Sequence, residues 1–184
     1  MINPKVVLND GKVMLRAYAK RDIDETYKAI RESLPELMPW LPFAHPDYSP
    51  KESREWILSR PKEWKKGNAY DFAIFSAADG AYLGGCGINR IDYMNMIANL
   101  GYWIRSTRAG NGFTPAAARL LAGWGFKELG LKRIEIVVAA GNLRSQRVAE
   151  KTGATREGIE RNRITVGDKV YDGVMFSLIP ADLK

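Results

Sequence analysis

Residues 101–126 read GYWIRSTRAGNGFTPAAARLLAGWGF, and this stretch decides the fold. Aromatic and β-branched residues predict a strand over residues 97–105. A helix is predicted from about Phe113, with Pro115 in its first turn. Its apolar face recurs every three or four residues at Ala117, Leu120, Leu121 and Trp124. Strand and helix therefore flank a tight turn that contains two glycines.

This turn predicts an anion-binding site. It consists of Ala109, Gly110, Asn111, Gly112, Phe113 and Thr114. Such a turn aims unpaired backbone N–H groups at one point, with the positive end of the helix macrodipole behind them, and this suits a phosphate or pyrophosphate. No lysine lies between Arg105 and Phe126, which excludes a Gly-Lys-Ser/Thr nucleotide turn. Pro115 stands at the third glycine of the dinucleotide fingerprint, which excludes that motif.

The turn, following GYW in the strand, resembles the acetyl-coenzyme A site of the GNAT acetyltransferase superfamily. Within it the chain is most similar to the RimJ/RimL branch, which acetylates N-terminal amines of ribosomal proteins. Gly112 falls on the glycine of the family pattern Gln/Arg-x-x-Gly-x-Gly/Ala, and Thr114 falls on its last position. Ala109 replaces the Gln or Arg, directly after Arg108. Residues 142–153, NLRSQRVAEKTG, match the family's Asn-x-x-Ser-x-x-Val-x-Glu-Lys-x-Gly.

The resemblance implies acetyl-coenzyme A as the acyl donor. Residues 108–114 would hold its pyrophosphate, and backbone groups of Trp103, Ile104 and Arg105 would hold the oxyanion and the pantetheine arm, with Asn142 as a further pantetheine contact. Arg144 and Arg147 oppose the macrodipole of their helix by about 0.3–1 kcal/mol each. We therefore expect one or both of these arginines, together with Lys151, to face the adenosine phosphates. A solvated basic helix face is the alternative.

Transfer from a thioester to an amine requires a neutral nucleophile, donors for the oxyanion and a proton for the departing thiolate. The resemblance gives Ser145 the role of proton donor, and Ser145 shares a helix face with Asn142. The alternative is that Asn142 is an ordinary N-cap and Ser145 an ordinary residue of the first turn.

The general base is less well defined. RimL-type enzymes carry a glutamate where this chain has Ile164. Glu160 is near that position but not at it, so we predict that deprotonation is left to water or to a carboxylate from elsewhere, with Glu157, Glu160 and Glu36 as candidates.

Composition limits the class of protein. The chain has 184 residues and a net charge of +7, and we interpret residues 1–184 as one acetyltransferase domain. The chain has one cysteine, Cys86, which excludes an internal disulfide. Because it also has only one histidine, His45, we expect no metal site. Cys86 is read as a buried small residue rather than an acyl carrier, which favours direct transfer.

No long apolar run and no signal-peptide pattern occur, so a cytoplasmic protein without membrane contact is expected. The positive charge fits a phosphorylated cofactor, an acidic peptide or ribosomal RNA, with simple solubility as the alternative. Direct binding to DNA is not expected.

The other patterns predict a mixed α+β fold. Strands are predicted over residues 12–17, 71–76, 82–90, 132–138, 155–166 and 169–179. Helices are predicted from Asp22 or Asp24 to about Ser33, from Pro50 to about Lys66, and from Asn142 to Gly153. This order gives a mostly antiparallel sheet of about seven strands with helices on both faces, as the resemblance also implies.

Residues 34–46 contain four prolines and several large apolar side chains. The prolines forbid a long regular element, while the apolar side chains favour burial. The segment is therefore either a loop packed on the core or a lid over a binding groove. After it, Ser49 and Glu52 are spaced as a capping box.

The sequence thus favours an acetyl-coenzyme A-dependent N-acetyltransferase that acts on a protein N-terminus, such as that of a ribosomal protein. A small acceptor remains an alternative, namely a polyamine, an aminoglycoside or an amino-acid derivative. A non-catalytic module that binds coenzyme A or the ribosome is another alternative. Ile164 supports it, because it stands where RimL-type enzymes carry a glutamate. The resemblance also implies a homodimer.

Overall fold

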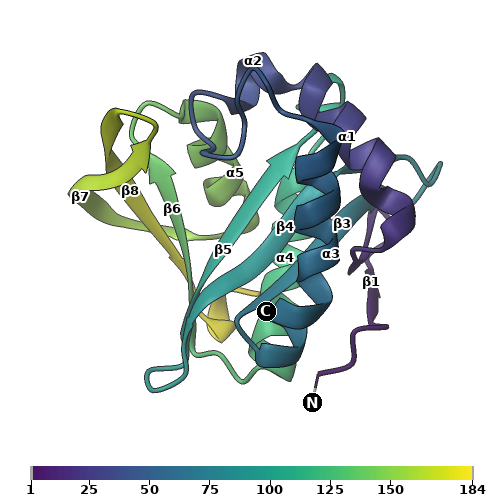
Figure 1. Ribbon diagram of the computed structural model, residues 1–184. Coiled ribbons are helices and arrows are strands. Elements are labelled where there is room, and N and C mark those ends of the chain that lie inside the picture. The colour runs from purple at the N-terminus through teal and green to yellow at the C-terminus, as the bar shows by residue number, and fades with distance from the viewer. Residues whose placement is uncertain (1, 184) are drawn as a thin grey trace.

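One mixed sheet runs through the computed structural model, which describes residues 2–183 (Figure 1). Its strands pair in the order β1-β2-β3-β4-β5-β6-β8-β7. Their bounds are β1 Val7–Asn9, β2 Val13–Ala17, β3 Ala69–Ser76, β4 Tyr82–Asp92, β5 Ile97–Ile104, β6 Arg133–Ala139, β7 Thr155–Val166 and β8 Lys169–Leu178. The predicted fold class is confirmed. The eighth strand is β1, whose three residues are too few to show alternation in the sequence.

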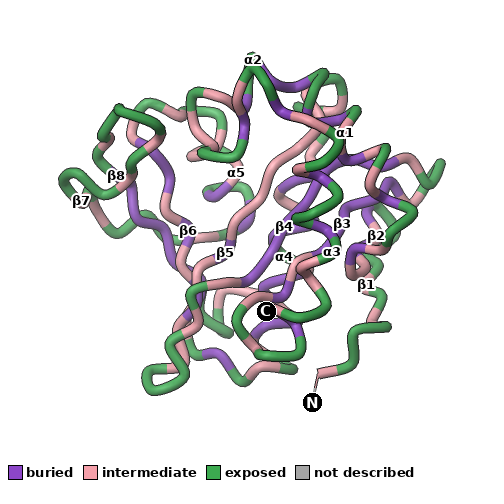
Figure 2. Tube along the Cα trace, in the orientation of Figure 1, coloured by how far each residue is buried: buried purple, intermediate pink, exposed green. Residues whose placement is uncertain are grey.

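Helices cover both faces of this sheet. They are α1 Ile23–Glu32, α2 Leu34–Leu37, α3 Pro50–Lys66, α4 Phe113–Glu128 and α5 Leu143–Thr152, with short 3₁₀ turns η1 Lys20–Asp22, η2 Ser106–Arg108 and η3 Pro180–Leu183. Alternate residues of β3 face opposite sides of the sheet. Phe72 and Ile74 cluster with Leu121 of α4. Ala73 and Phe75 cluster instead with Ala29 of α1 and Ile57 of α3. The buried residues run along β3 and β4 in the middle of the sheet (Figure 2).

Strands β5 and β6 are parallel and pair over only Ile97↔Arg133, Ala98↔Ile134 and Asn99↔Glu135. Beyond Asn99, β5 stays paired with β4 as far as Ile104. Strand β6 stays paired with β8 as far as Ala139. The two strands therefore separate toward their C-terminal ends, and Figure 1 shows the gap widening between them.

Helix α4, which follows β5, packs closely on the sheet at Gly125. A methyl group at Gly125 would lie 2.6 Å from Ile88 Cδ1 and 3.2 Å from Ile134 Cδ1. A methyl group at Gly123, two residues earlier, would have only Leu183 Cδ1 nearby, at 3.8 Å. The two glycines therefore occupy very different environments within one helix.

Gly125→Ala is expected to lower the free energy of unfolding by about 1–2 kcal/mol, because overpacking exceeds the gain in helix propensity. Gly123→Ala is the matched control and should raise it by about 0.5–1 kcal/mol. Denaturant unfolding measures both changes. Equal stability of the two variants would contradict the close contact of α4 with Ile88 and Ile134.

Candidate active site

The predicted turn between β5 and α4 is held by its glycines and by one side chain. Gly110 and Gly112 have φ angles of 84° and 72°, in the left-handed region that favours glycine. Asn111 Nδ2 donates to the carbonyl oxygens of Arg108, at 3.1 Å, and of Ala109, at 3.3 Å. These bonds fold the Asn111 side chain under the turn.

Five consecutive N–H groups, those of residues 110–114, have no acceptor within residues 2–183. They lie at the N-terminal end of α4, where the helix macrodipole is positive. Lys12 adds a positive charge, because its Nζ lies 5.8 Å from the centroid of the Phe113 ring. The arrangement can bind an anion, as the sequence predicts, and Lys12 is a contact that sequence reasoning missed.

The end of β5 presents backbone N–H groups to the gap left by β6. The Arg105 N–H donates to the Leu83 carbonyl oxygen at 2.7 Å, so it faces β4. N–H directions alternate along an antiparallel strand, so the Trp103 N–H also faces β4, whereas those of Tyr102 and Ile104 face the gap. Of the three backbone groups predicted from the sequence, Ile104 alone presents its N–H to the gap.

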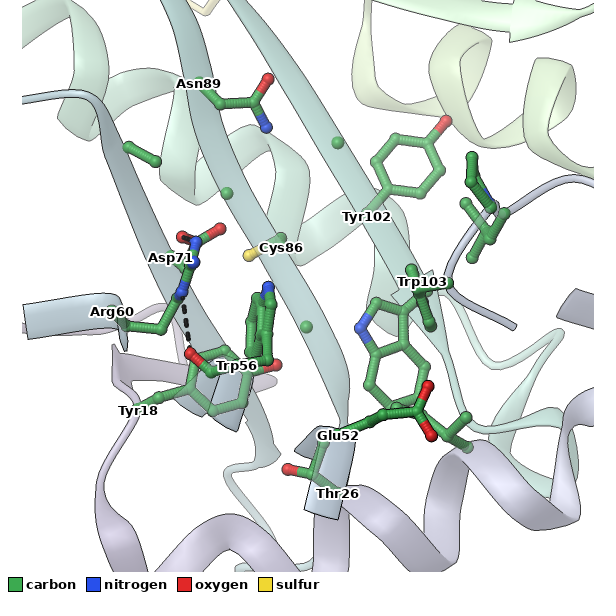
Figure 3. Close-up of a pocket in the computed structure, with 18 of the residues that line it drawn as sticks. Tyr18, Thr26, Glu52, Trp56, Arg60, Asp71, Cys86, Asn89, Tyr102 and Trp103 are labelled. Atoms are coloured by element: carbon green, nitrogen blue, oxygen red, sulfur yellow. Dashed lines mark hydrogen bonds and ion pairs between the residues drawn. The ribbon is translucent and has the colours of Figure 1, made fainter. Parts of the chain in front are cut away.

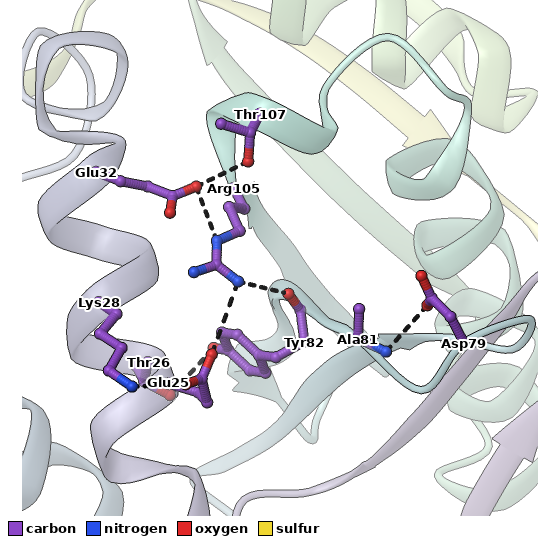
Figure 4. Close-up of polar contacts among 9 residues, drawn as sticks. All are labelled: Glu25, Thr26, Lys28, Glu32, Asp79, Ala81, Tyr82, Arg105 and Thr107. Carbon is purple, nitrogen blue, oxygen red and sulfur yellow. Dashed lines mark hydrogen bonds and ion pairs between the residues drawn. The ribbon is translucent and has the colours of Figure 1, made fainter.

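The Arg105 side chain fixes the end of β5 against α1 (Figure 4). Its Nε lies 2.8 Å from a carboxylate oxygen of Glu32, and its Nη1 lies 3.7 Å from one of Glu25. Thr107 donates to the same Glu32 carboxylate at 2.8 Å. Arg105 is therefore a structural anchor of this strand end.

Ser145 and Tyr102 meet across the gap. Tyr102 donates to the Ser145 carbonyl oxygen at 3.0 Å and accepts from the Ser145 hydroxyl at 3.2 Å. Asn142 is the N-cap of α5, because its Oδ1 accepts from the Ser145 N–H at 3.1 Å. Burial raises the pKa of Tyr102 to about 12, so its hydroxyl stays protonated at neutral pH.

A cavity of about 650 Å³ lies between the sheet and the helices α1 and α3 (Figure 3). Gly85, Gly87 and Gly101 are part of its floor, while Tyr18, Trp56 and Trp103 are among its aromatic walls. Tyr102 also lines this cavity, although it packs on the α4 side of the sheet. The cavity therefore reaches the gap between β5 and β6, and through Tyr102 it reaches Ser145.

Asp71 stands at one side of a trough in the cavity floor. It pairs with Gly87 across β3 and β4, and Gly87 pairs with Gly101 across β4 and β5. A methyl group at Gly101 would have no atom within 4 Å, so the trough is open there, whereas one at Gly87 would lie 2.4 Å from Asp71 Oδ1, so that glycine makes room for the carboxylate. Asp71 Oδ2 lies 2.9 Å from Arg60 Nη1, and the Asp71 side chain is 13% exposed. Burial raises the pKa of Asp71 above its usual value, and the Arg60 guanidinium opposes that rise.

Two more carboxylates, Glu52 and Glu55, line the cavity. Glu52 accepts from the Ser49 N–H at 2.9 Å, as the capping-box spacing predicts, and lies 2.6 Å from His45 Nε2. Hydrogen bonds from Ser49 and His45 lower the pKa of Glu52. With Asp71, the cavity holds three carboxylates against Arg60 and His45.

Residues 34–46 fulfil both of the roles considered for them. Leu34, Leu37 and Ala44 are buried in a cluster with Ile30 of α1. Leu41, Phe43 and His45 line the cavity. The segment is thus packed on the core through some of its side chains and covers the cavity through others, which lie between Leu41 and His45.

The structure places the other predicted residues away from the cavity. The Glu160 carboxylate lies 2.6 Å from Arg163 Nε. Glu157 pairs with Arg133 and Ser177, which lowers its pKa to about 2. Glu36 is exposed on α2, and Ile164 pairs with Tyr171 in the β7–β8 hairpin. The basic role of Glu160 therefore stays a prediction without support from its position.

The cations predicted to face phosphates are exposed. Arg144, Arg147 and Lys151 lie on the surface of α5, and none has a carboxylate within 4 Å among residues 2–183. Arg108 lies 3.7 Å from Asp79.

Residues 2–183 contain no cluster of three or more His, Cys, Asp or Glu that could hold a metal. Over the same span of chain, no helix is long and apolar enough to cross a membrane.

Sequence reasoning missed Asp71 and Tyr102. The segment YDFAIFS carries a signal for Asp71, because it is the one charged residue in a strand that is apolar on both faces. Tyr102 carries no such signal, since an aromatic residue in a strand is ordinary. Only the approach of α5 to β5 gives its hydroxyl a partner.

Comparisons with known proteins agree with this geometry. A family model described as an acetyltransferase (GNAT) domain matches residues 12–155. The "Putative ribosomal N-acetyltransferase YdaF" of Bacillus subtilis is 31% identical over 169 residues, which cover 91% of both chains. A putative ribosomal-protein-serine acetyltransferase from Vibrio cholerae is similar in structure, with a TM-score of 0.82, 29% identity, and coverage of 97% of this chain and 100% of that one.

The fold is also that of RimL, described as a ribosomal alpha-N-protein acetyltransferase in complex with coenzyme A. The TM-score is 0.87 at 20% identity, with 97% of this chain and 100% of that chain covered.

Cys86 is expected to be unreactive in the native protein, because it is 4% exposed and burial raises the pKa of its thiol. Its reaction with a disulfide reagent at pH 8 should be at least about 100-fold slower than in guanidinium chloride, since the reagent must wait for the protein to open. Fast native reaction, equal to that of the unfolded chain, would show an accessible thiol and reopen an acyl-carrying role for Cys86.

Proposed function

Because the chain belongs to the GNAT family of N-acetyltransferases, we propose that its donor is acetyl-coenzyme A and its acceptor the N-terminal α-amine of a protein. One observation carries this proposal: Tyr102 lines the cavity on one side of the sheet and contacts Ser145 on α5 on the other. A thioester and an amine can therefore approach each other from opposite faces.

The donor side suits a phosphorylated cofactor. The free N–H groups of residues 110–114 would bind the pyrophosphate, with Lys12 as an additional cation beside them. Arg147 and Lys151 would face the adenosine phosphates from α5. The Asn142 Oδ1 is occupied by the cap of α5, which leaves its Nδ2 for a carbonyl of the pantetheine arm.

In the reaction the amine nitrogen attacks the thioester carbonyl carbon, so that a C–N bond forms and the C–S bond breaks. The N–H groups of Tyr102 and Ile104 face the gap and would stabilise the oxyanion. The Ser145 hydroxyl, turned from Tyr102 toward the sulfur, would give its proton to the thiolate and regain one from solvent water. Tyr102 holds Ser145 in place through the bond to its carbonyl oxygen.

Asp71 is the carboxylate that we propose as acceptor of the amine proton. It lines the cavity and borders the trough over Gly87 and Gly101, where an amine can approach the gap. Its raised pKa makes it a better base than an exposed aspartate. An α-amine, with a pKa of about 8, demands less of this base than a lysine, with a pKa of about 10.4.

Two observations bear on the acceptor. The relatives are named for ribosomal proteins, which supports a protein N-terminus. The three carboxylates of the cavity suit any cationic amine, including a small polyamine. That acidity is not evident from residues 34–46, whose one carboxylate is Glu36. Cytoplasmic location, ribosome contact and a homodimer remain predictions.

Acetyl-coenzyme A offered with a library of short peptides should release coenzyme A and yield N-terminally acetylated products, detected by mass spectrometry. Peptides blocked at the α-amine but containing lysine are the control and should react far more slowly. Acetylation of spermidine in preference to every peptide would favour the small-amine alternative. Binding of acetyl-coenzyme A without transfer to any amine would favour the non-catalytic module.

Asp71→Asn should lower kcat by about 10²-fold or more, the scale of a general base. In the wild type, activity should fall as the pH drops through the pKa of Asp71, because the protonated carboxyl cannot accept a proton. That acidic limb should disappear in the variant. Glu55→Gln, which alters an exposed carboxylate of the same cavity, is the control and should retain kcat. A folded Asp71→Asn variant with unchanged kcat would refute this role and leave deprotonation to water.

A further inference from the structure

A second cavity, of about 280 Å³, lies next to the first. Its polar lining includes Arg90, Asp92, Asn99, Glu135 and Arg163. Asn89 lines the first cavity and Asn99 lines the second, and these two residues pair across β4 and β5. Asn99 Nδ2 donates to Asn89 Oδ1 at 3.0 Å. A single pair of side chains therefore separates the two cavities.

The cavities share one face of the sheet. Gly87 and Asn89 are two residues apart in β4, and Gly101 and Asn99 are two residues apart in β5, so all four face the same side. The Asn89–Asn99 pair lies about 7 Å from the Gly87–Gly101 pair, because the two pairs are two residues apart along each strand. Ile97, which lines the second cavity, is about 7 Å further along. An extended peptide with its amine at the trough would enter the second cavity with its third to fifth residues.

The asparagine pair has the hydrogen-bonding groups that such a chain needs. Asn89 Nδ2 and Asn99 Oδ1 have no partner within residues 2–183. They offer one donor and one acceptor, which match the C=O and N–H of a peptide group.

Most charged side chains of the second cavity have partners within the protein. Asp92 accepts from the N–H groups of Met94 and Asn95, Glu135 lies 2.9 Å from Arg133, and Arg163 lies 2.6 Å from Glu160. Arg90 has no such partner in the span 2–183. Its φ of 50° and the register shift of β4 between Asn89 and Asp92 take it out of the regular ladder. Arg90 is therefore the cation left for a ligand.

We propose that the acceptor binds as an extended peptide across both cavities. Its N-terminal residue occupies the trough beside Asp71, its next residues cross the Asn89–Asn99 pair, and a carboxylate side chain at its third to fifth position pairs with Arg90. This inference rests on the proposed acetyl transfer and specifies its acceptor as a protein N-terminus with an early acidic residue.

The test compares three acceptors that share the same N-terminal residue. They are a dipeptide, a pentapeptide with Asp at the fourth position and a pentapeptide with Lys at that position. Extension to the Asp pentapeptide should lower KM by about tenfold and leave kcat nearly unchanged, because the added contacts form equally in the ground state and the transition state. Arg90→Ala should raise KM for the Asp pentapeptide by about threefold to fivefold, as expected for a partly exposed ion pair. Asn99→Leu should raise KM for both pentapeptides, and neither variant should affect the dipeptide.

Arg21→Ala, which alters an exposed arginine of η1, is the matched control and should change none of these constants. Equal KM values for the dipeptide and both pentapeptides would overturn the extended site, as would a loss in Arg90→Ala that is the same for all acceptors. The absence of transfer to every peptide is a different result, because it removes the protein acceptor itself and the proposed function with it.

Discussion

The separation of β5 from β6 after Asn99 is the constraint on which the rest of the structure depends. Backbone N–H groups at a strand edge normally need a partner, and in a closed sheet the next strand supplies it. Here β4 holds β5 on one side as far as Ile104, and the Arg105–Glu32 contact ties its end to α1. Strand β6 follows β8 instead. The edge of β5 beyond Asn99 is therefore left with donors that a reacting carbonyl can use.

The gap joins two regions that the sheet otherwise keeps apart. On one side lie the turn before α4 and the N-terminal end of α5, and on the other lies the cavity beneath α1 and α3. Tyr102 belongs to both, because it lines that cavity and exchanges hydrogen bonds with Ser145. The direct transfer that we propose would use such a passage, because the donor and the acceptor would enter from opposite sides of the sheet.

The polarity of the two sides is opposite. The chain carries a net charge of +7, yet the cavity gathers three carboxylates against Arg60 and His45. The cations Lys12, Arg147 and Lys151 lie by contrast beside the turn and on α5. Gly87 makes room for the carboxylate on the acidic side, because a methyl group there would lie 2.4 Å from Asp71 Oδ1. These charges suit the proposed substrates, because an anionic donor and a cationic acceptor would be attracted to opposite faces.

The sequence alone determined the features that depend on neighbours in the chain. Glycines at 110 and 112, the Asn142 cap and the Ser49–Glu52 pair follow from local backbone geometry. The helices other than α2, and all strands but β1, follow from local patterns of apolar and capping residues. Tertiary structure decided which distant residues share a site. Asp71 faces the trough because of its register with Gly87, Tyr102 reaches Ser145 because α5 approaches β5, and Glu160 is kept from the cavity because β8 and β6 stand between β7 and β5. Strand order and register depend on the packing of the whole chain, and no local pattern encodes them.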